Sequence, residues 1–416
     1  MKKLLFLCVV LLAAATTLTA IKTGKSIFYS DSYMLRARGV EASYWNPANL
    51  APGKYIDVWL PFVNSGIQVN NNSLDLDTYN YVVSQEYLTE DDKDMIMRKL
   101  SHILHGSVSG NMSVFGFTMS NMAFSSSISY DGELSLSKRY MELLLYGNTD
   151  SLYVFDKSTT NAKALSYMDL TFGAGNFTIP FLPYGFPEIR AGFSASLLAG
   201  IGSADLREFN GYFSSTFDGL TMHQDAVLRS GIGGAGFKSM IGFASSPIEN
   251  LEVGLTLDNI FGYINWVGVL ENQNLHFAAD SLYIINLEDD FYTETHESED
   301  IDSFSTELPP ELRLAALWSH KRMNFSADYV QGFKNSAVTD PTGRLALGAE
   351  VFPAPFLPVH FGIGFGNSNY PWRVSYGIGL KSKTGEFGIS VQSYDSLFPG
   401  MKSKGLSLGS FVRLWI

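Results

Sequence analysis

Apolar and polar side chains alternate along many short segments of the chain. From Leu251 to Asp258, every second side chain is an aliphatic one, and Glu252, Thr256 and Asp258 fall on the other face. The same alternation recurs over residues 311–318, 344–351, 373–381 and 406–416. A period of two residues predicts β-strands. Because the apolar face carries no charge, these strands are typical of a barrel wall with lipid on one side and a lumen on the other.

Counting such segments gives fourteen expected strands, an even number as in single-chain bacterial barrels. They cover residues 55–69, 108–118, 122–135, 164–177, 188–203, 222–244, 250–259, 311–319, 322–333, 343–353, 357–366, 373–383, 385–394 and 404–416. We therefore predict an all-β fold, a transmembrane antiparallel β-barrel of about 14 strands.

The connections between these strands alternate in length. The short ones are Met119–Asn121, Ile179–Pro187, Ser245–Glu249, His320–Lys321, Pro355–Phe356 and Thr384. The long ones are residues 70–107, 136–163, 204–221 and 260–310, followed by three of modest length. Short periplasmic turns at one end and long extracellular loops at the other are how outer-membrane barrels are built.

The first twenty residues indicate export. Met1–Lys3 is basic, Leu4–Ala15 is apolar but too short to span a bilayer, and small residues follow, so residues 1–20 are expected to be a cleaved signal peptide. Cleavage is expected after Ala20, with Ala15 as the alternative site. The one cysteine, Cys8, lies in this stretch, and the mature chain would then have no disulfide, thiolate metal site or cysteine nucleophile.

Composition narrows the class of partner. Glycine and aromatic residues are abundant (38 Gly, 6 Trp, 21 Tyr and 30 Phe), while charged residues make up only 17%. The net charge is −12, from 29 basic and 41 acidic residues. An acidic chain without basic stripes argues against a nucleic-acid partner. Outer-membrane lipid is the expected environment.

Three connections carry a further pattern. Residues 89–104 predict a helix, with a capping box from Thr89 to Asp92 and an apolar stripe that includes Ile96 and Leu100. This helix would either cover the barrel mouth and contact a hydrophobic ligand, or pack on its own loop, which we favour. Tyr140–Tyr146 predicts a second short helix. The acidic stretch Glu288–Glu307 lacks the regular spacing of a calcium loop and is expected to be a solvated surface loop.

Three segments match patterns of cofactor, catalytic or metal sites, but each lacks the surroundings that such a site needs. Gly231–Gly236 matches a dinucleotide fingerprint but is followed by another strand instead of a helix. Gly405–Gly409 matches a nucleophile elbow but lies inside the last strand. His102 and His105 are three residues apart on the predicted loop helix and lack an evident third metal ligand. We therefore expect no catalytic residues, no metal, no cofactor and no enzymatic activity.

Eight charged residues fall on the lumen face of the predicted strands, opposite the apolar face. They are Glu252, Asp258, Arg313, Asp328, Arg344, Glu350, Arg373 and Arg413. Buried charges must be paired or hydrated. These residues would form either a lattice of ion pairs that holds the wall to whatever fills the lumen, which we favour, or a polar conduit.

Residues 37–51 carry a resemblance to a known family. The residues that match are Gly39, Ala42, Asn46, Pro47, Ala48 and Leu50. This segment resembles the N-terminal Gly-x-x-Ala-x-x-x-Asn-Pro-Ala-x-Leu motif of the long-chain fatty-acid transporter superfamily (FadL/TodX type) and of PorV-type barrels. Further islands are similar to an uncharacterised branch of that superfamily: residues 72–80, 87–93, 142–148 and 255–260, with Trp266.

The resemblance implies fourteen strands and a small plug (hatch) formed by residues 21–52 inside the lumen of a barrel formed by residues 53–416. It also implies passive transport of small hydrophobic molecules across the outer membrane. The alternative is a PorV-like scaffold that does not transport and instead docks secretion or envelope proteins. An outer-membrane hydrolase is a third possibility, for which no nucleophile or carboxylate dyad is evident.

Overall fold

The computed structural model describes residues 23–51, 56–148, 152–180, 187–216, 219–282, 292–336, 338–339, 341–366 and 370–415. The expected signal peptide lies outside these residues. Among the described residues, the longest helix has ten residues, and no helix is long and apolar enough to cross a membrane.

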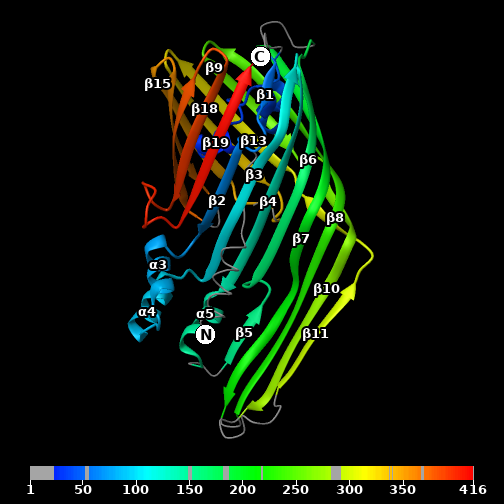
Figure 1. The fold of residues 1–416 in the computed structure, drawn as a ribbon, viewed down its shortest axis with the longest axis vertical. Coiled ribbons are helices and arrows are strands. Elements are labelled where there is room, and N and C mark those ends of the chain that lie inside the picture. Colours follow the sequence, from blue (N-terminus) through cyan, green and yellow to red (C-terminus); the bar gives the residue numbers. More distant parts are fainter. Residues whose placement is uncertain are drawn as a thin grey trace.

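Fourteen antiparallel wall strands close into a barrel, as the alternation predicts (Figure 1). The first wall strand is interrupted and comprises β1 (Asp57–Trp59) and β2 (Ser65–Asn71). The others, in wall order, are β3 (Ile103–Met119), β4 (Met122–Ser137), β6 (Asn161–Thr178), β7 (Ile189–Thr216), β8 (Gly219–Ile248), β9 (Leu251–Asp258), β13 (Glu311–His320), β14 (Met323–Gly332), β15 (Arg344–Ala354), β16 (Leu357–Phe365), β17 (Trp372–Lys381), β18 (Gly385–Tyr394) and β19 (Gly405–Trp415). The last strand closes the wall by pairing with the first, with Leu408 opposite Ile67 and Leu414 opposite Val58.

The two faces of the wall differ as the alternation requires. On β13, Arg313 and Leu317 are buried inside, while Leu314 and Trp318 are exposed outside. Large apolar side chains are exposed on the outer face of most wall strands, among them Ile67, Leu170, Phe193, Ile241, Phe325, Leu345, Val359, Ile378, Ile389 and Leu408. Tight turns join β3 to β4, β8 to β9, β13 to β14, β15 to β16 and β17 to β18. These turns gather near the end of the barrel where the C-terminus lies (Figure 1).

The first wall strand departs from the prediction of one strand over residues 55–69. It breaks at residues 60–64, where Phe62 adopts a positive φ of 63°. The break leaves backbone N–H and C=O groups of the neighbouring strands without their regular ladder partners. The N–H of Phe62 donates to the carbonyl of Ser113 at 2.7 Å, and the side-chain oxygen of Asn64 accepts from the N–H of Val412 at 2.7 Å. These bonds replace the missing ladder contacts, because buried backbone groups need partners.

Two predicted loops are wrong, because the structure builds strands from them. Residues 204–216 belong to β7 and residues 219–221 to β8, and these strands are 28 and 30 residues long. Residues 260–310 contain β10 (Gly262–Leu282), β11 (Tyr292–Asp300) and β12 (Phe304–Leu308). Register shifts near 206–208 and 266–269 break the period of two and hide the strands from pattern analysis. The described part of the acidic stretch is accordingly mostly strand.

These additional strands form a sheet that projects beyond the barrel. β10 pairs with β8, β11 and β12 pair with β10, and β5 (Leu152–Asp156) pairs with β7. We call β5, β10, β11, β12 and the parts of β7 and β8 paired with them the sheet extension. It runs away from the end that carries the tight turns (Figure 1).

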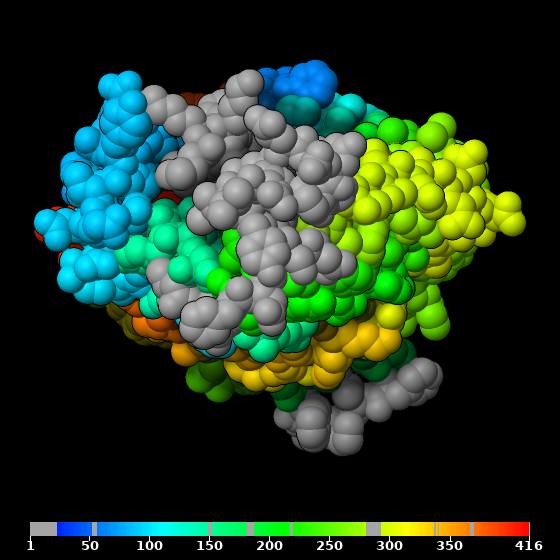
Figure 2. All heavy atoms as spheres, turned by 90° about the horizontal axis from the view of Figure 1, so that it is seen from below, coloured from blue at the N-terminus to red at the C-terminus, as the bar shows by residue number. Residues whose placement is uncertain are grey.

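Helices α3 (Leu76–Ser84), α4 (Glu90–Lys99) and α5 (Lys138–Tyr146) lie at the same end as the sheet extension. α4 begins with the predicted capping box but ends at Lys99, because β3 already begins at Ile103. Its apolar stripe packs against α5 and the ends of β3 and β4, in a cluster that includes Ile96, Leu100, Met141 and Leu145. Seen from this end, α3 and α4 lie on the side opposite β11 (Figure 2).

Candidate functional site in the barrel lumen

Residues 23–51 lie inside the barrel, and we call them the lumen segment. The segment folds into four short helical turns: η1 (Gly24–Tyr29), η2 (Gly39–Glu41), α2 (Ala42–Trp45) and η3 (Pro47–Asn49). Almost all of its residues are buried, including the large rings of Phe28, Tyr29, Tyr33 and Trp45. η1 contacts β2 and β15–β19, whereas η3 contacts β6, β7 and β8. The segment therefore reaches from one wall of the lumen to the other.

The Asn-Pro-Ala motif forms the turn that meets the β6–β8 wall. Asn46 has the extended backbone favoured before proline, and its side-chain oxygen accepts from the N–H of Ala48 at 3.1 Å. Its side-chain nitrogen donates to the carbonyl of Phe243 on β8 at 3.1 Å. Leu50 packs with Ala42 of α2 and with Ala123 of β4. Each of these motif residues is thus held against another element.

Glycines of the wall make room for this turn. A Cβ atom added at Gly175 or Gly192 would lie 1.7 Å or 2.3 Å from the backbone of Pro47. Gly39, in the motif itself, has a φ of +61°, and a Cβ there would lie 1.4 Å from a carboxylate oxygen of Asp57. Such close approach of two backbones requires residues without side chains. The wall glycines were not singled out by sequence analysis, since their partners are far away in the chain.

Within the part of the chain that the structure describes, four ion pairs join the lumen segment to the wall. They are Lys25–Glu386 at 2.9 Å, Asp31–Arg373 at 2.7 Å, Arg36–Glu350 at 3.3 Å and Arg38–Glu252 at 3.0 Å. All but the last are largely shielded from solvent. Buried charges are costly unless paired in this way. Glu252 is shared with Arg190 of β7, so the Arg38 pair is one half of a three-residue contact.

The structure places all eight charged residues named from the alternation on the lumen side of the wall. Glu252, Glu350 and Arg373 belong to the ion pairs just described. Arg313 donates to the carbonyl of Asp31 at 3.0 Å, and Asp328 accepts from the N–H of Met34 at 3.0 Å. Arg413 donates to Asp57 at 2.7 Å, and Asp57 in turn accepts from the N–H of Val40. The last two, Arg344 and Asp258, line a chamber beside the segment.

This chamber is a cavity of about 70 Å³ whose lining combines charged and polar side chains with apolar ones such as Met240 and Leu308. Its charged residues are Asp31, Asp169, Lys238, Asp258, Glu311, Arg313 and Arg344. Tyr44 of the lumen segment donates to Asp169 at 2.7 Å, and Arg344 is paired with Glu311. At about 30 Å³ per water molecule, the chamber holds roughly two waters.

The outer face of the wall carries a larger, apolar groove of about 760 Å³. It runs over β2, β3, β4 and β17–β19. Its apolar lining consists of Ile67, Met112, Ile128, Tyr130, Tyr376, Ile378, Ile389, Val391 and Leu408. Small residues lie beneath it, including Gly377 and Gly409, which touch Phe28 and Gly24 of η1 from the other side. At this place the wall between the groove and the lumen segment is only one backbone thick.

The other motifs named from the sequence stay apart from this site. Gly231–Gly236 lies within β8, where no helix follows, and Ser407 of β19 hydrogen-bonds to Tyr394 inside the wall. The His105 ring hydrogen-bonds to Ser135 at 2.8 Å. Among the described residues, the group of ligand-type side chains close enough to hold a metal ion is instead His223, Asp225 and His276.

The chain is similar to one described family and to several solved structures. Residues 47–237 match the model of a family described only as a family of unknown function (DUF5723). No curated protein sequence matches the chain. Among solved structures, the Ralstonia pickettii toluene transporter TbuX is similar over 91% of this chain and 94% of its own, at 12% identity and a TM-score of 0.50.

Two further structures of this type show weaker similarity. A Pseudomonas aeruginosa FadL homologue matches over 95% of this chain and 98% of its own, at 11% identity and a TM-score of 0.46. The P. putida toluene transporter TodX matches over 90% and 92%, at 11% identity and a TM-score of 0.43. The likeness to TbuX shows the fold: the chain is a closed antiparallel barrel of the FadL/TodX type, as the resemblance of residues 37–51 implies.

Proposed function

We propose that this chain is an outer-membrane channel through which small hydrophobic molecules pass passively, and that the lumen segment is its gate. The observation that carries the proposal is the layered arrangement at η1. A segment held only by noncovalent contacts lies on one side of a thin wall, and an apolar groove lies on the other side. Displacing the segment would expose the lumen side of the wall that carries the groove, where β19 stays paired with β2 and Leu408 lies opposite Ile67.

The outer surface supports a location in the membrane. The side chains exposed on the outer face of β13–β19 are mainly leucine, isoleucine, valine and phenylalanine. Exposing an apolar belt of this size to water would be unfavourable for a monomer. In the closed wall, the backbone groups of the spanning strands hydrogen-bond to one another. This is required in a membrane, because lipid tails offer no hydrogen-bonding partners. A barrel of this kind in the outer membrane agrees with the export signal expected at residues 1–20.

The size and lining of the groove support a hydrophobic solute. Its volume of about 760 Å³ lies within the range of about 300–1,000 Å³ that is typical of small-molecule sites. Its lining is aliphatic and aromatic, with two tyrosines, Tyr130 and Tyr376. TbuX and TodX are toluene transporters by description, and this chain shares their fold at low sequence identity. The likeness therefore supports the class of function without identifying the solute.

The polar chamber favours a second candidate, passage of small polar solutes. Its lining offers carboxylates, guanidinium groups and one lysine beside apolar side chains such as Met240 and Leu308. An ion or a small polar molecule would find charged partners there. The two candidates differ in the route: the first leaves through the wall at the groove, and the second follows the lumen axis.

Transport measurements on proteoliposomes separate these candidates. Uptake of a lipophilic dye and swelling in small sugars or amino acids would be compared for the whole chain and for a chain that lacks residues 23–51. The hydrophobic channel requires dye uptake that is reduced when Ile67→Trp fills the groove, with Leu345→Trp on a distant part of the wall as the matched control. Swelling that is unaffected by Ile67→Trp, without dye uptake, would favour the polar route.

A barrel that stays impermeable to both probes after removal of the segment contradicts transport of either kind. Heat-modifiable mobility on gels verifies that each variant forms a barrel. A silent barrel would leave the alternative of a scaffold for secretion or envelope proteins, which stays a prediction from the sequence alone.

A further inference from the structure

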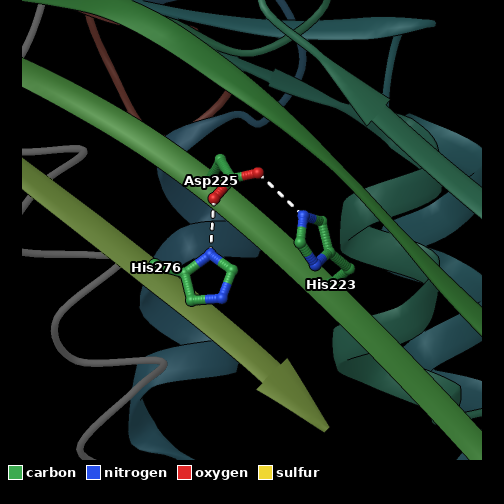
Figure 3. A group of neighbouring side chains, drawn as sticks. All are labelled: His223, Asp225 and His276. Carbon is green, nitrogen blue, oxygen red and sulfur yellow. Dashed lines mark hydrogen bonds and ion pairs between the residues drawn. The ribbon is translucent and has the colours of Figure 1, made fainter. Parts of the chain in front are cut away.

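Three side chains with metal-binding chemistry meet on the sheet extension, far from the lumen segment. His223 and Asp225 are two residues apart on β8, so their side chains share one face. His276 lies on β10 directly opposite Asp225 in the strand register. The imidazoles converge on one carboxylate: Nε2 of His223 lies 2.8 Å from Oδ2, and Nδ1 of His276 lies 2.6 Å from Oδ1 (Figure 3).

The three side chains are held in place by the sheet. β7, β8, β10 and β11 pair continuously on both sides of the cluster. The ring of Tyr212 stacks beside His223 at 5.9 Å, and the two imidazole rings lie 5.0 Å apart at 74°. Sites built on strands keep their geometry better than sites on loops. Each side chain is 39–46% exposed, so an ion can reach the cluster from solvent.

We propose that His223, Asp225 and His276 bind a divalent transition-metal ion of the zinc class. Their ligand atoms all lie within 4.8 Å of one another. Ligand atoms of a tetrahedral zinc site are about 3.3 Å apart, so small side-chain rotations suffice to enclose an ion. Two nitrogens and one carboxylate oxygen suit zinc, nickel or copper, whereas calcium and magnesium prefer oxygen ligands only. Three protein ligands leave one position open for water or an external molecule.

The cluster was not foreseen from the sequence, from which we expected no metal. His223 and His276 are 53 residues apart, and only the pairing of β8 with β10 brings them together. His102 and His105, the pair with suggestive spacing, do not form such a group.

Calorimetric titration with Zn²⁺ tests the proposal. The whole chain is purified in detergent with a tag that contains no histidine, treated with a chelator, and titrated. One ion per chain is expected, and Co²⁺ at the same site should give the visible absorption of a low-symmetry, near-tetrahedral complex. His276→Asn and Asp225→Asn should each weaken Zn²⁺ binding by about 100-fold or more, because each removes one of three ligands.

His296→Asn is the matched control. His296 lies on β11 opposite Leu275, hence on the other face of the same sheet, and it is exposed. Its replacement should leave the affinity and the stoichiometry unchanged. The proposal is overturned if His276→Asn binds Zn²⁺ as tightly as the unmodified chain, or if His296→Asn loses binding equally. Asparagine retains hydrogen-bonding capacity at these positions, and unchanged heat-modifiable mobility verifies the barrel in each variant.

Discussion

Replacing Asp31 by asparagine should free the lumen segment from one wall of the barrel. Asp31 accepts a charge-assisted hydrogen bond from Arg373 at 2.7 Å, and Arg373 also donates to the carbonyl of Ser30 at 3.0 Å. The Arg373 side chain is only 6% exposed. Without the carboxylate, the contact between the Arg373 guanidinium group and Asp31 loses its charge assistance. The substitution therefore weakens the closed state in which the segment fills the lumen.

The size of the effect follows from the burial of the pair. Removing one partner of a buried ion pair costs about 3–5 kcal/mol. Asparagine still offers an oxygen that accepts a hydrogen bond, so we take the lower end, about 3 kcal/mol. Since every 1.4 kcal/mol changes an equilibrium constant about tenfold, the displaced state should become about 150-fold more populated.

Cysteine labelling measures this population. The chain has one cysteine, Cys8, which lies in the expected signal peptide and can be replaced by serine. Ser43 is buried and lines the chamber, and Ser43→Cys changes a single atom. A maleimide reaches this cysteine only when the segment leaves its place. The labelling rate in proteoliposomes should then rise about 150-fold when Asp31→Asn is added, by the equilibrium worked out above.

The exposed ion pair of Lys334 and Glu307 supplies the control. Its N–O distance is 2.7 Å, but both side chains are more than half exposed, and such pairs contribute less than about 1 kcal/mol. Lys334→Gln should leave the labelling rate unchanged. An acceleration of less than about fivefold by Asp31→Asn, with the barrel still folded, would refute a buried ion pair worth about 3 kcal/mol. A fivefold change corresponds to only about 1 kcal/mol. Equal acceleration by Lys334→Gln would refute the buried-pair explanation too.

Two further predictions concern the turn of the lumen segment and the loop helices. Gly39→Ala should lower the free energy of unfolding in urea by more than Gly147→Ala, because both glycines have positive φ but only the first meets an atom, a carboxylate oxygen of Asp57; equal losses would contradict the steric argument. Burial alone would raise the pKa of Asp75, but hydrogen bonds from Lys99 and Thr78 lower it overall. A carboxyl group with a lowered pKa contributes stability that is present above about pH 4 and is lost as the pH falls through the folded-state pKa. The protection factors of the α3 amides, which correct for the slower intrinsic exchange at low pH, should therefore fall in acid, and Asp75→Asn should remove this dependence. An unchanged acid response in that variant would show that another group is responsible.

The wall strands with uninterrupted alternation lie where the sequence predicts them. β13 to β18 each begin and end within two residues of the predicted limits. In a strand between lipid and lumen, successive side chains must face the two sides in turn, whichever strand it pairs with. The prediction was wrong where the pairing is irregular. In β10 a register shift near residues 266–269 changes which face each side chain takes, and the period disappears although the strand continues.

The alternation predicts which charged side chains face the lumen, but not which residues they pair with. The alternation indicated that Glu350 and Arg373 point inward, but not that Arg36 and Asp31 would meet them across more than 300 residues of sequence. Lys25–Glu386 was not anticipated at all. Charge pairing depends on the position of the lumen segment along the barrel axis, which no local pattern encodes.

By itself, the sequence determined the class of fold, the number of wall strands and the end at which the loops lie. These features arise from local periodicity and from the length of each connection, both of which can be counted along the chain. Only the tertiary structure decided how far β7 and β8 extend, which wall residues the lumen segment contacts, and that His223, Asp225 and His276 meet. Those features depend on register between strands, and register is set by contacts between residues that are distant in sequence.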